Sequence, residues 1–434
     1  MISFDECVDY IFNLPRKGKI NDLASTKSVL DEFYKDNSIK IIHVAGTNGK
    51  GSVCAFLNSI LINAGFKVGL FTSPHLINVN ERIKINNIDI SDEDFVSSFS
   101  YVMDLLKAKD LIAGASFFEI VFLMAMRYFS INNTEYIILE TGLGGRLDQT
   151  NCIGSKSLSI IAKLGLDHTE YLGDTLDKIA FEKAGIISKN TPVVYFDNHD
   201  GAENIIKKVA SDNNSTCYSI KKEDITVKSV TKEGIDFSLA NEYYYFDNVR
   251  INMVATYQTI NAALAILAIK ALNDSKITDD IILKSIKETK WAGRMEEVLP
   301  SIYVDGAHNE DGIKAFIESF KNMPHLSGKL KLIFSVVSDK DYDAMIKMIK
   351  EIDLFSEVYV CTIESKRALS LDKLKGAFKD YPDDKVFFYE KLEDAFINAT
   401  KEFTKEDELY ITGSLYLVGQ IKSDIKSGVL NVRF

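Results

Sequence analysis

Hydrophobic residues along this chain follow two alternating patterns. Short, mostly apolar runs predict strands at residues 39–42, 67–71, 136–139, 159–162, 302–304, 332–337, 358–360, 386–388 and 409–411, of which 39–42 and 136–139 are typical of buried strands. Between them, apolar residues recur at helical spacing and predict helices over residues 4–12, 53–64, 117–129, 257–272 and 309–320, with others that end near Tyr34 and begin after residue 174. This alternation of strand and helix is typical of α/β proteins with a parallel sheet.

Weaker patterns mark the remaining segments. A loop is expected near residues 14–18, and short alternating runs over residues 190–250 are typical of hairpins. The strand-and-helix pattern restarts around residues 291–296. We therefore expect a larger N-terminal domain, residues 1–295, and a smaller α/β domain with a parallel core, residues 296–434.

Composition narrows the class of protein. The 434 residues include 46% hydrophobic residues, enough for large cores, and the net charge of −11 argues against a general nucleic-acid binder. No apolar run approaches membrane-spanning length, and the N-terminus lacks the pattern of a signal peptide. The five cysteines are scattered and show neither metal-binding nor disulfide spacing. We expect a cytoplasmic protein that binds neither membranes nor nucleic acid.

A glycine-rich turn follows the predicted strand at residues 39–42 and leads into a helix that should end at Gly65. Glycines let backbone N–H groups turn toward an anion, the helix N-terminus adds its dipole, and Lys50 supplies a positive charge. The spacing departs from the general Walker A form, because Gly46 stands three residues before Gly49 instead of five. The flanking strand and helix favour a phosphate loop over an ordinary tight turn. This loop comprises Gly46, Thr47, Asn48, Gly49, Lys50, Gly51 and Ser52.

Polar motifs also follow other predicted strands, where open α/β sheets bind ligands. Glu140 directly follows the predicted strand at residues 136–139, the place where a Walker-type fold puts a magnesium ligand. A glycine-rich segment follows at residues 142–148. Each motif alone is also explained as a satisfied loop or helix cap. The histidines favour the functional alternative, because four of the six lie in strand-end motifs. These are His43, His75, His168 and His308.

The string Gly-Thr-Asn-Gly-Lys-Gly-Ser resembles the nucleotide loop of the folylpolyglutamate synthase and dihydrofolate synthase branch of the Mur ligase superfamily. Further landmarks of that family follow in the same order: Thr72-Ser73-Pro74, Asn80-Glu81-Arg82-Ile83, Gly142 to Asp148, Leu166-Asp167-His168, Lys183-Ala184-Gly185-Ile186, Gln258 with Asn261, Arg294, Asp305 to Asn309, and Thr412-Gly413-Ser414. The cell-wall branch carries an additional UDP-sugar domain before the loop, for which the 42 preceding residues are too few. The resemblance implies a P-loop ATPase domain with a mostly parallel sheet, followed by a smaller Rossmann-like domain.

The resemblance also implies a reaction, ATP-dependent amide formation. A carboxylate of a pteroate or folate attacks the γ-phosphate of ATP to give an acyl phosphate, and the amino group of L-glutamate then displaces phosphate. Both steps move negative charge, so Mg²⁺ and fixed cations should supply most of the stabilisation.

The family motifs imply a role for each matching residue of this chain. Catalytic roles fall to Lys50, His168, Lys183, Asp305 and His308. ATP would be bound by the phosphate loop and by Gln258, Asn261, Arg294, Asp305 and His308. The expected magnesium ligands are Ser73, Glu140, His168 and Lys183, of which Lys183 would carry a carbamate formed with carbon dioxide. The acceptor or glutamate would be bound by Arg82, Arg146, Asp148 and Ser414.

Several alternatives stay open from the sequence. A phosphate-loop NTPase without a ligase product, and a nucleotide-binding regulator without turnover, are the two rival classes. The acceptor is dihydropteroate, a reduced folate, or both, and Arg146-Leu147-Asp148 resembles the bifunctional bacterial form. We expect small-molecule substrates only, and a monomer.

Overall fold

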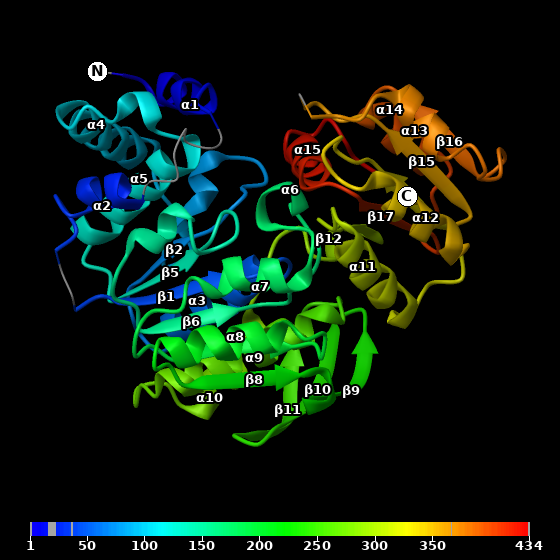
Figure 1. The fold of residues 1–434 in the computed structure, drawn as a ribbon. Helices are drawn as coiled ribbons and strands as arrows, with labels where there is room; N and C mark the ends of the chain where they lie inside the picture. The colour runs from blue at the N-terminus through cyan, green and yellow to red at the C-terminus, as the bar shows by residue number, and fades with distance from the viewer. Residues whose placement is uncertain (1, 16–22, 36–37, 366, 433–434) are drawn as a thin grey trace. The chain divides into compact units, whose positions relative to one another are not determined.

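The computed structural model describes residues 2–15, 23–35, 38–365 and 367–432. The chain folds into two compact units, each described by itself (Figure 1). The first contains Met1–Thr226, Phe237–Arg250 and Ile260–Thr289, and the second contains Val227–Asp236, Ile251–Thr259 and Lys290–Phe434. The loop expected near residues 14–18 lies largely outside the described residues.

The first unit is built on an eight-stranded sheet with the order β4-β3-β2-β5-β1-β6-β7-β8. Its strands are β1 (Lys40–Ala45), β2 (Val68–Phe71), β3 (Ile83–Ile85), β4 (Ile88–Asp89), β5 (Tyr136–Glu140), β6 (Leu158–Ile161), β7 (Val193–Asp197) and β8 (Cys217–Lys221). Neighbouring strands pair in parallel from β2 through β5, β1, β6 and β7 to β8. Strands β3 and β4 add an antiparallel edge next to β2. The prediction of a mostly parallel sheet is confirmed.

Helices cover this sheet and explain why its central strands read as continuous apolar runs. They are α1 (Phe4–Phe12), α2 (Leu23–Leu30), α3 (Lys50–Asn63), α4 (Asp92–Ala108), α5 (Phe117–Ile131), α6 (Thr169–Leu172), α7 (Leu176–Ala184), α8 (Ala202–Asp212), α9 (Tyr257–Leu272) and α10 (Asp279–Glu288), with short 3₁₀ turns at η1 (Val79–Arg82), η2 (Ile112–Gly114), η3 (Gln149–Cys152) and η4 (Lys222–Asp224). One core joins α1, α4 and α5 to β2 and β5, and another joins α7 and α8, which lie side by side in Figure 1, to β6 and β7. Every residue of β5 is buried, as expected for a strand covered on both faces.

The prediction of hairpins throughout residues 190–250 is wrong for the first half of that segment. There β7, α8 and β8 form a parallel strand–helix–strand unit that extends the large sheet. The helix was missed although α8 has a regular amphipathic pattern, in which Ala202, Ile206 and Ala210 are buried at intervals of four residues. The second half is a three-stranded sheet with the order β11-β10-β9, formed by β9 (Ile225–Thr231), β10 (Gly234–Ala240) and β11 (Tyr245–Ile251).

The second unit contains a six-stranded sheet with the order β12-β13-β17-β14-β15-β16. Its strands are β12 (Glu296–Leu299), β13 (Ile302–Val304), β14 (Leu330–Phe334), β15 (Glu357–Cys361), β16 (Val386–Tyr389) and β17 (Glu408–Thr412). All neighbours are parallel except β12, which pairs antiparallel with β13. The helices are α11 (Glu310–Asn322), α12 (Tyr342–Ile352), α13 (Leu371–Ala377), α14 (Leu392–Thr400) and α15 (Leu415–Lys426). The predicted parallel core is confirmed.

A buried carboxylate begins β17 in this second unit. Glu408 is fully buried and accepts hydrogen bonds from Lys232 Nζ at 2.6 Å, His325 Nδ1 at 2.7 Å and Tyr410 Oη at 2.9 Å. Burial alone would raise the pKa of Glu408, but the bonds from His325 and Lys232 outweigh it and lower the pKa to about 2. The cluster fixes the amino-terminal end of β17.

All five cysteines are free thiols in this structure, and all but Cys217 are buried. Over the described ranges, every helix is too short or too polar to cross a membrane.

Candidate active site

The phosphate loop connects β1 to α3, as the sequence predicted. Gly49, at a left-handed φ of 87°, precedes the first residue of α3, and a Cβ atom there would lie 2.4 Å from Oδ1 of Asn261. Lys50 begins the helix, and its Nζ atom donates to the carbonyl oxygens of Gly46 and Thr47 at 3.1 and 3.3 Å. The N–H groups in the first turn of α3 have no acceptor inside the helix, so they face the loop as anion donors.

The segment after β6 holds the phosphate loop in place. The backbone N–H groups of Thr47 and Asn48 donate to the carbonyl of Lys163 at 2.9 and 3.2 Å. The Thr47 hydroxyl donates to the carbonyl of Gly165 at 2.9 Å and accepts from the N–H of Gly165 at 3.1 Å. At Gly46 a Cβ atom would lie 2.8 Å from Cβ of Ala162, so the two segments are in backbone contact. These contacts set the shape of the loop before any ligand binds.

Glu140 stands beside this loop at the carboxyl end of β5. It pairs in register with Val44 of β1, and its side chain is buried. The backbone N–H of Ser73, just after β2, donates to Glu140 Oε2 at 2.9 Å. The structure therefore brings Ser73 and Glu140 together, which are two of the four expected magnesium ligands.

The glycine-rich segment after Glu140 is organised by Asp148. Its buried carboxylate accepts from the N–H groups of Gly142 and Leu143, both at 2.9 Å, and from both the N–H and the hydroxyl of Thr150. The Thr150 hydroxyl also contacts Nε2 of the buried His43 at 2.8 Å. Asp148, an expected substrate ligand, thus faces the inside of its own loop.

Arg146, the other charged residue expected to bind substrate in this segment, contacts α7. Its Nη2 and Nε atoms donate to Glu182 Oε1 at 2.8 and 3.2 Å, and its guanidinium lies 5.6 Å from the ring centre of Phe181. The Arg146 side chain is 43% exposed, so its outer face remains open to solvent.

Lys183 is brought directly to the phosphate loop. Its Nζ atom donates to the carbonyl oxygen of Gly46 at 2.8 Å, and only 4% of the residue is exposed. Burial, with a smaller effect from the Lys50 charge, lowers the pKa of Lys183 to about 7. A lysine at the end of an amphipathic helix would ordinarily face solvent, whereas this one is a buried amine whose pKa is lowered into the neutral range.

His168 lies before α6, after the segment that holds the loop. Its backbone adopts a left-handed conformation with φ of 52°, which is costly for a residue with a side chain and is often found at functional sites. Its N–H donates to Asp167 Oδ1 at 2.8 Å, and its side chain is 42% exposed.

An aromatic surface, missed in the sequence analysis, lies in the same unit next to the Ser73 segment. Phe12, which is 53% exposed, packs against His75 and Phe117 with ring centres 5.9 and 5.4 Å apart. Arg82 donates to His75 Nδ1 at 2.8 Å and lies 5.0 Å from the Phe117 ring centre. Burial and the Arg82 charge lower the pKa of His75 to about 3, so the ring is neutral. In the sequence, the signal for this surface was Phe12, an aromatic residue at the end of a predicted helix.

In the second unit, Asp305 follows β13 and is almost completely buried. It accepts hydrogen bonds from Tyr257 Oη at 2.6 Å, the N–H of Met295 at 2.9 Å and the N–H of Ala307 at 2.8 Å. Burial raises the pKa of Asp305, and the nearby Arg294 opposes that change. Asp305 therefore joins the strand end to the segment before β12 and to the start of α9.

The other predicted residues of the second unit lie around the same strand ends. Arg294 Nη1 donates to the carbonyl of Gly293 at 2.8 Å, and His308 Nδ1 bonds the carbonyl of Gly306 at 2.8 Å. Ser414 caps α15 by accepting from the N–H of Tyr416 at 3.2 Å. Gln258 is buried on α9. Asn261, which belongs to the first unit, is also buried on α9 and lies against the phosphate loop at Gly49.

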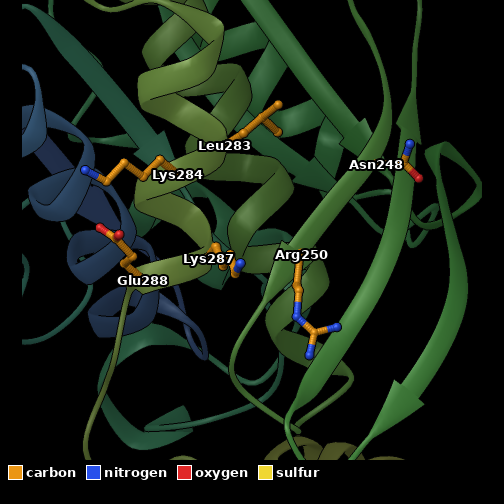
Figure 2. Close-up of a pocket in the computed structure, with 6 residues that line it drawn as sticks. All are labelled: Asn248, Arg250, Leu283, Lys284, Lys287 and Glu288. Atoms are coloured by element: carbon orange, nitrogen blue, oxygen red, sulfur yellow. The ribbon is translucent and has the colours of Figure 1, made fainter.

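A surface hollow of about 380 Å³ lies in the first unit but contains none of the predicted site residues. Figure 2 shows its lining, from β11 and α10: Asn248, Arg250, Leu283, Lys284, Lys287 and Glu288. The hollow is therefore not part of the predicted site at the strand ends.

The side chains that could hold a metal ion favour an open magnesium site. Within the described part of the chain, no three His, Cys, Asp or Glu side chains converge as a closed metal cage. Mg²⁺ does not need one, because it usually keeps several waters and binds through one or two carboxylates together with phosphate oxygens. The buried Glu140 carboxylate next to Ser73 fits this kind of open site.

Comparison with known proteins gives a consistent result. Residues 115–269 match the Mur ligase middle domain, and residues 293–415 match the Mur ligase glutamate ligase domain. The dihydrofolate synthase/folylpolyglutamate synthase of Bacillus subtilis (strain 168) is 34% identical over 409 residues, which cover 91% of this chain and 92% of that protein. The folylpolyglutamate synthase of Lacticaseibacillus casei is 28% identical over 441 residues, 98% of this chain and 100% of that protein.

Solved structures point to the same family as these relatives. The crystal structure of folylpolyglutamate synthase from Thermotoga maritima superposes with a TM-score of 0.83 at 30% identity, covering 99% of this chain and 98% of that one. The resemblance drawn from the sequence motifs is thereby confirmed. The chain belongs to the family of dihydrofolate synthases and folylpolyglutamate synthases.

Proposed function

We propose that this protein is an ATP-dependent ligase that joins L-glutamate through an amide bond to a folate, to dihydropteroate, or to both. The observation that carries the proposal is the pairing of β1 with β5, which puts the Glu140 carboxylate beside the Lys50 phosphate loop. A related structure, 26% identical with a TM-score of 0.82, is an FPGS–AMPPCP complex, which supports ATP as the nucleotide. A lysine on a phosphate loop with a carboxylate beside it is the arrangement that many phosphoryl-transfer enzymes use.

In the first step, a carboxylate oxygen of the acceptor forms a bond to the γ-phosphorus, and the bond from that phosphorus to the bridging oxygen of ADP breaks. Lys50 holds the β- and γ-phosphates, together with the N–H groups at the start of α3. Ser73, Glu140 and His168 would hold Mg²⁺, which neutralises the charge that develops on the phosphates. In the second step, the neutral amino nitrogen of glutamate bonds to the acyl carbon, the bond from that carbon to the phosphate oxygen breaks and phosphate leaves. The ammonium form of glutamate loses two protons in all, one before the attack and one after it, and the amide nitrogen keeps one.

Lys183 is proposed to work as a carbamate. The ammonium group first loses a proton, and the neutral amine then attacks CO₂. A C–N bond forms as one C=O π bond opens, and a second proton is released, which leaves an anionic oxygen ligand. The buried position and the pKa of about 7 support this chemistry, because they leave much of the amine unprotonated near neutral pH. The resulting oxygens are donors that Mg²⁺ prefers.

The acceptor is proposed to bind at the aromatic surface formed by Phe12, His75 and Phe117. Flat heteroaromatic rings stack on such side chains, and a pteridine is a ring system of this type. Its position after β2, next to Ser73, supports delivery of the acceptor carboxylate to the phosphate loop. Arg82, bonded to His75, supplies a cation at the same surface.

The remaining roles rest on the family motifs. Gln258, Asn261, Arg294, Asp305 and His308 are proposed to contact the nucleotide, and Asp305 and His308 to take part in catalysis. Arg146, Asp148 and Ser414 are proposed to contact the acceptor or the glutamate. The proposed division into an ATP-binding domain, residues 1–295, and a ligase domain, residues 296–434, places these groups on both parts of the chain.

The decisive experiment supplies ATP, Mg²⁺ and L-glutamate with dihydropteroate or a reduced folate in turn, and identifies products by mass spectrometry. The proposal expects glutamate-dependent phosphate release together with a product that is heavier by one glutamyl residue. Phosphate release that ignores glutamate would instead indicate an NTPase. Nucleotide binding without any turnover would indicate a regulator.

A further inference from the structure

The end of α7 is tied to the glycine-rich segment by the partly buried side-chain amide of Asn151. Asn151 Nδ2 donates to the carbonyl oxygens of Arg146 and Gly185, both at 3.1 Å. These two carbonyls belong to segments that are separated in sequence but adjacent in space. Asn151 therefore bridges the glycine-rich segment and the residue that ends α7.

A buried lysine completes this bridge. Lys156 is 9% exposed, and its Nζ atom donates to Asn151 Oδ1 at 2.5 Å and to the carbonyl of Ile186 at 2.7 Å. The Ser159 hydroxyl donates to the same Ile186 carbonyl at 3.0 Å. Burying an amine is costly unless its hydrogen bonds are made, so this geometry is strongly specified. Neither Asn151 nor Lys156 has a part in the proposed chemistry.

The two bridged segments have almost no freedom to shift. A Cβ atom at Gly145 would lie 2.9 Å from the carbonyl oxygens of both Glu182 and Lys183, and one at Gly185 would lie 2.3 Å from Cβ of Arg146. Both distances are shorter than ordinary contacts, so the backbones touch directly. The same turn of α7 carries Lys183, whose amine contacts the phosphate loop.

We propose that Asn151 and Lys156 are positioning residues, which hold the last turn of α7 so that the Lys183 amine meets the phosphate loop at Gly46. The inference rests on the proposed role of Lys183 in the ligase reaction. A displacement of α7 by about 1 Å would move the Lys183 side chain away from the phosphates, and misplacement of that size can cost roughly 100-fold in rate.

The test compares two buried lysines in the full-length protein. Lys156→Met removes the amine of the bridge and keeps an apolar side chain of similar length. Lys331→Met is the matched control, since Lys331 is 3% exposed and its amine donates to the carbonyl of Ala399 at 2.8 Å in the second unit. Both variants should lower the melting temperature. Only Lys156→Met should lower kcat, by about 10- to 100-fold, with a smaller change in KM for ATP.

A second variant guards against misfolding of the first. Asn151→Asp keeps the size of the side chain and an oxygen for Lys156, but it loses the donations to Arg146 and Gly185. It should also lower kcat more than KM. Equal kcat in Lys156→Met, Lys331→Met and wild type, or a normal kcat in Asn151→Asp, would overturn the inference. If the wild type forms no glutamylated product at all, the proposed function fails instead.

Discussion

The side-chain amine of Lys183 donates a hydrogen bond to the backbone carbonyl of Gly46, 2.8 Å away and 137 residues earlier in the chain. The amine of Lys50 reaches the same oxygen at 3.1 Å. The two lysine amines thus share one acceptor, so a positive charge on one amine disfavours protonation of the other. The carbonyl of Gly46 links the residue expected to bind phosphate to the residue expected to be modified.

Lys183→Ala should lose nearly all ligation and recover part of it when short carboxylic acids are added, because they replace the missing carbamate oxygens. Steady-state ligation rates with and without added acid measure this effect. Lys178→Ala is the matched control, since Lys178 lies on the same helix with its side chain 62% exposed. A Lys183→Ala enzyme that works at the wild-type rate without added acid would contradict the carbamate.

Lys50→Ala should abolish ligation and leave the fold intact. Within the described part of the chain, the Lys50 amine donates to the carbonyl oxygens of Gly46 and Thr47 in its own loop, so its loss should remove phosphate binding without opening a core. Turnover assays together with thermal unfolding measure the two effects separately. Near-normal turnover in this variant would rule out the phosphate-loop assignment.

Glu140→Gln should weaken magnesium-dependent use of ATP more than it weakens metal-free nucleotide binding. The amide keeps the size of the side chain, and its oxygen can still accept from Ser73 N–H, but it lacks the charge that a hard cation prefers. Magnesium titrations of activity, compared with nucleotide affinity measured in a chelator, give the two quantities. Equal losses in both would remove Glu140 from the metal site.

Gly49→Ala should impair nucleotide binding more strongly than Gly65→Ala. Both glycines have left-handed backbones, with φ of 87° and 86°, so each substitution should cost about 1 kcal/mol of stability. Only at Gly49 does the added Cβ meet a neighbour, Asn261 Oδ1 at 2.4 Å, whereas the space beside Gly65 is open. Calorimetric titration with ATP and thermal unfolding distinguish the two. Equal nucleotide affinities in the two variants would show that the contact with Asn261 does not shape the loop.

Acid should destabilise the second unit partly through Glu408. The pKa of Glu408 is about 2 in the folded protein, below its ordinary value of 4.5. Its contribution is therefore complete above about pH 4.5 and is lost as the pH falls toward 2, a total of roughly 3 kcal/mol. Glu408→Gln should flatten the fall in free energy of unfolding over this range, measured by urea denaturation at several pH values. An unchanged slope would show that other carboxylates, such as Glu357, dominate.

The strands of both parallel sheets could be predicted because covered strands are continuous apolar runs, as in β5 and β17. The same reasoning missed α8, although its buried residues Ala202, Ile206 and Ala210 recur every four positions, because the whole segment was interpreted as hairpins. It also failed at β8, an edge strand that is half-exposed along most of its length. Partial burial explains the miss at β8 but not at β7, which is buried throughout and lies in the same segment predicted as hairpins.

The candidate site shows a different limit, at the level of residues. Motifs within one segment, such as the phosphate loop or Glu140 after β5, could be predicted from strand ends and residue types. Contacts between segments could not, because their acceptors are backbone carbonyls. The bonds of Lys183 to Gly46 and of Asn151 to Gly185 are examples, since a carbonyl oxygen has no identity in the sequence.

The central position of β1 in the large sheet has a consequence for how the protein folds. β1 pairs with β5 and β6, and in each pair roughly a hundred residues or more separate the partners along the chain. Closing such long loops is slow, because chain entropy is lost before the contacts compensate for it. The phosphate loop acquires its shape only when the segment after β6 arrives. A nucleotide therefore recognises, and by mass action stabilises, only chains in which the sheet has already been completed.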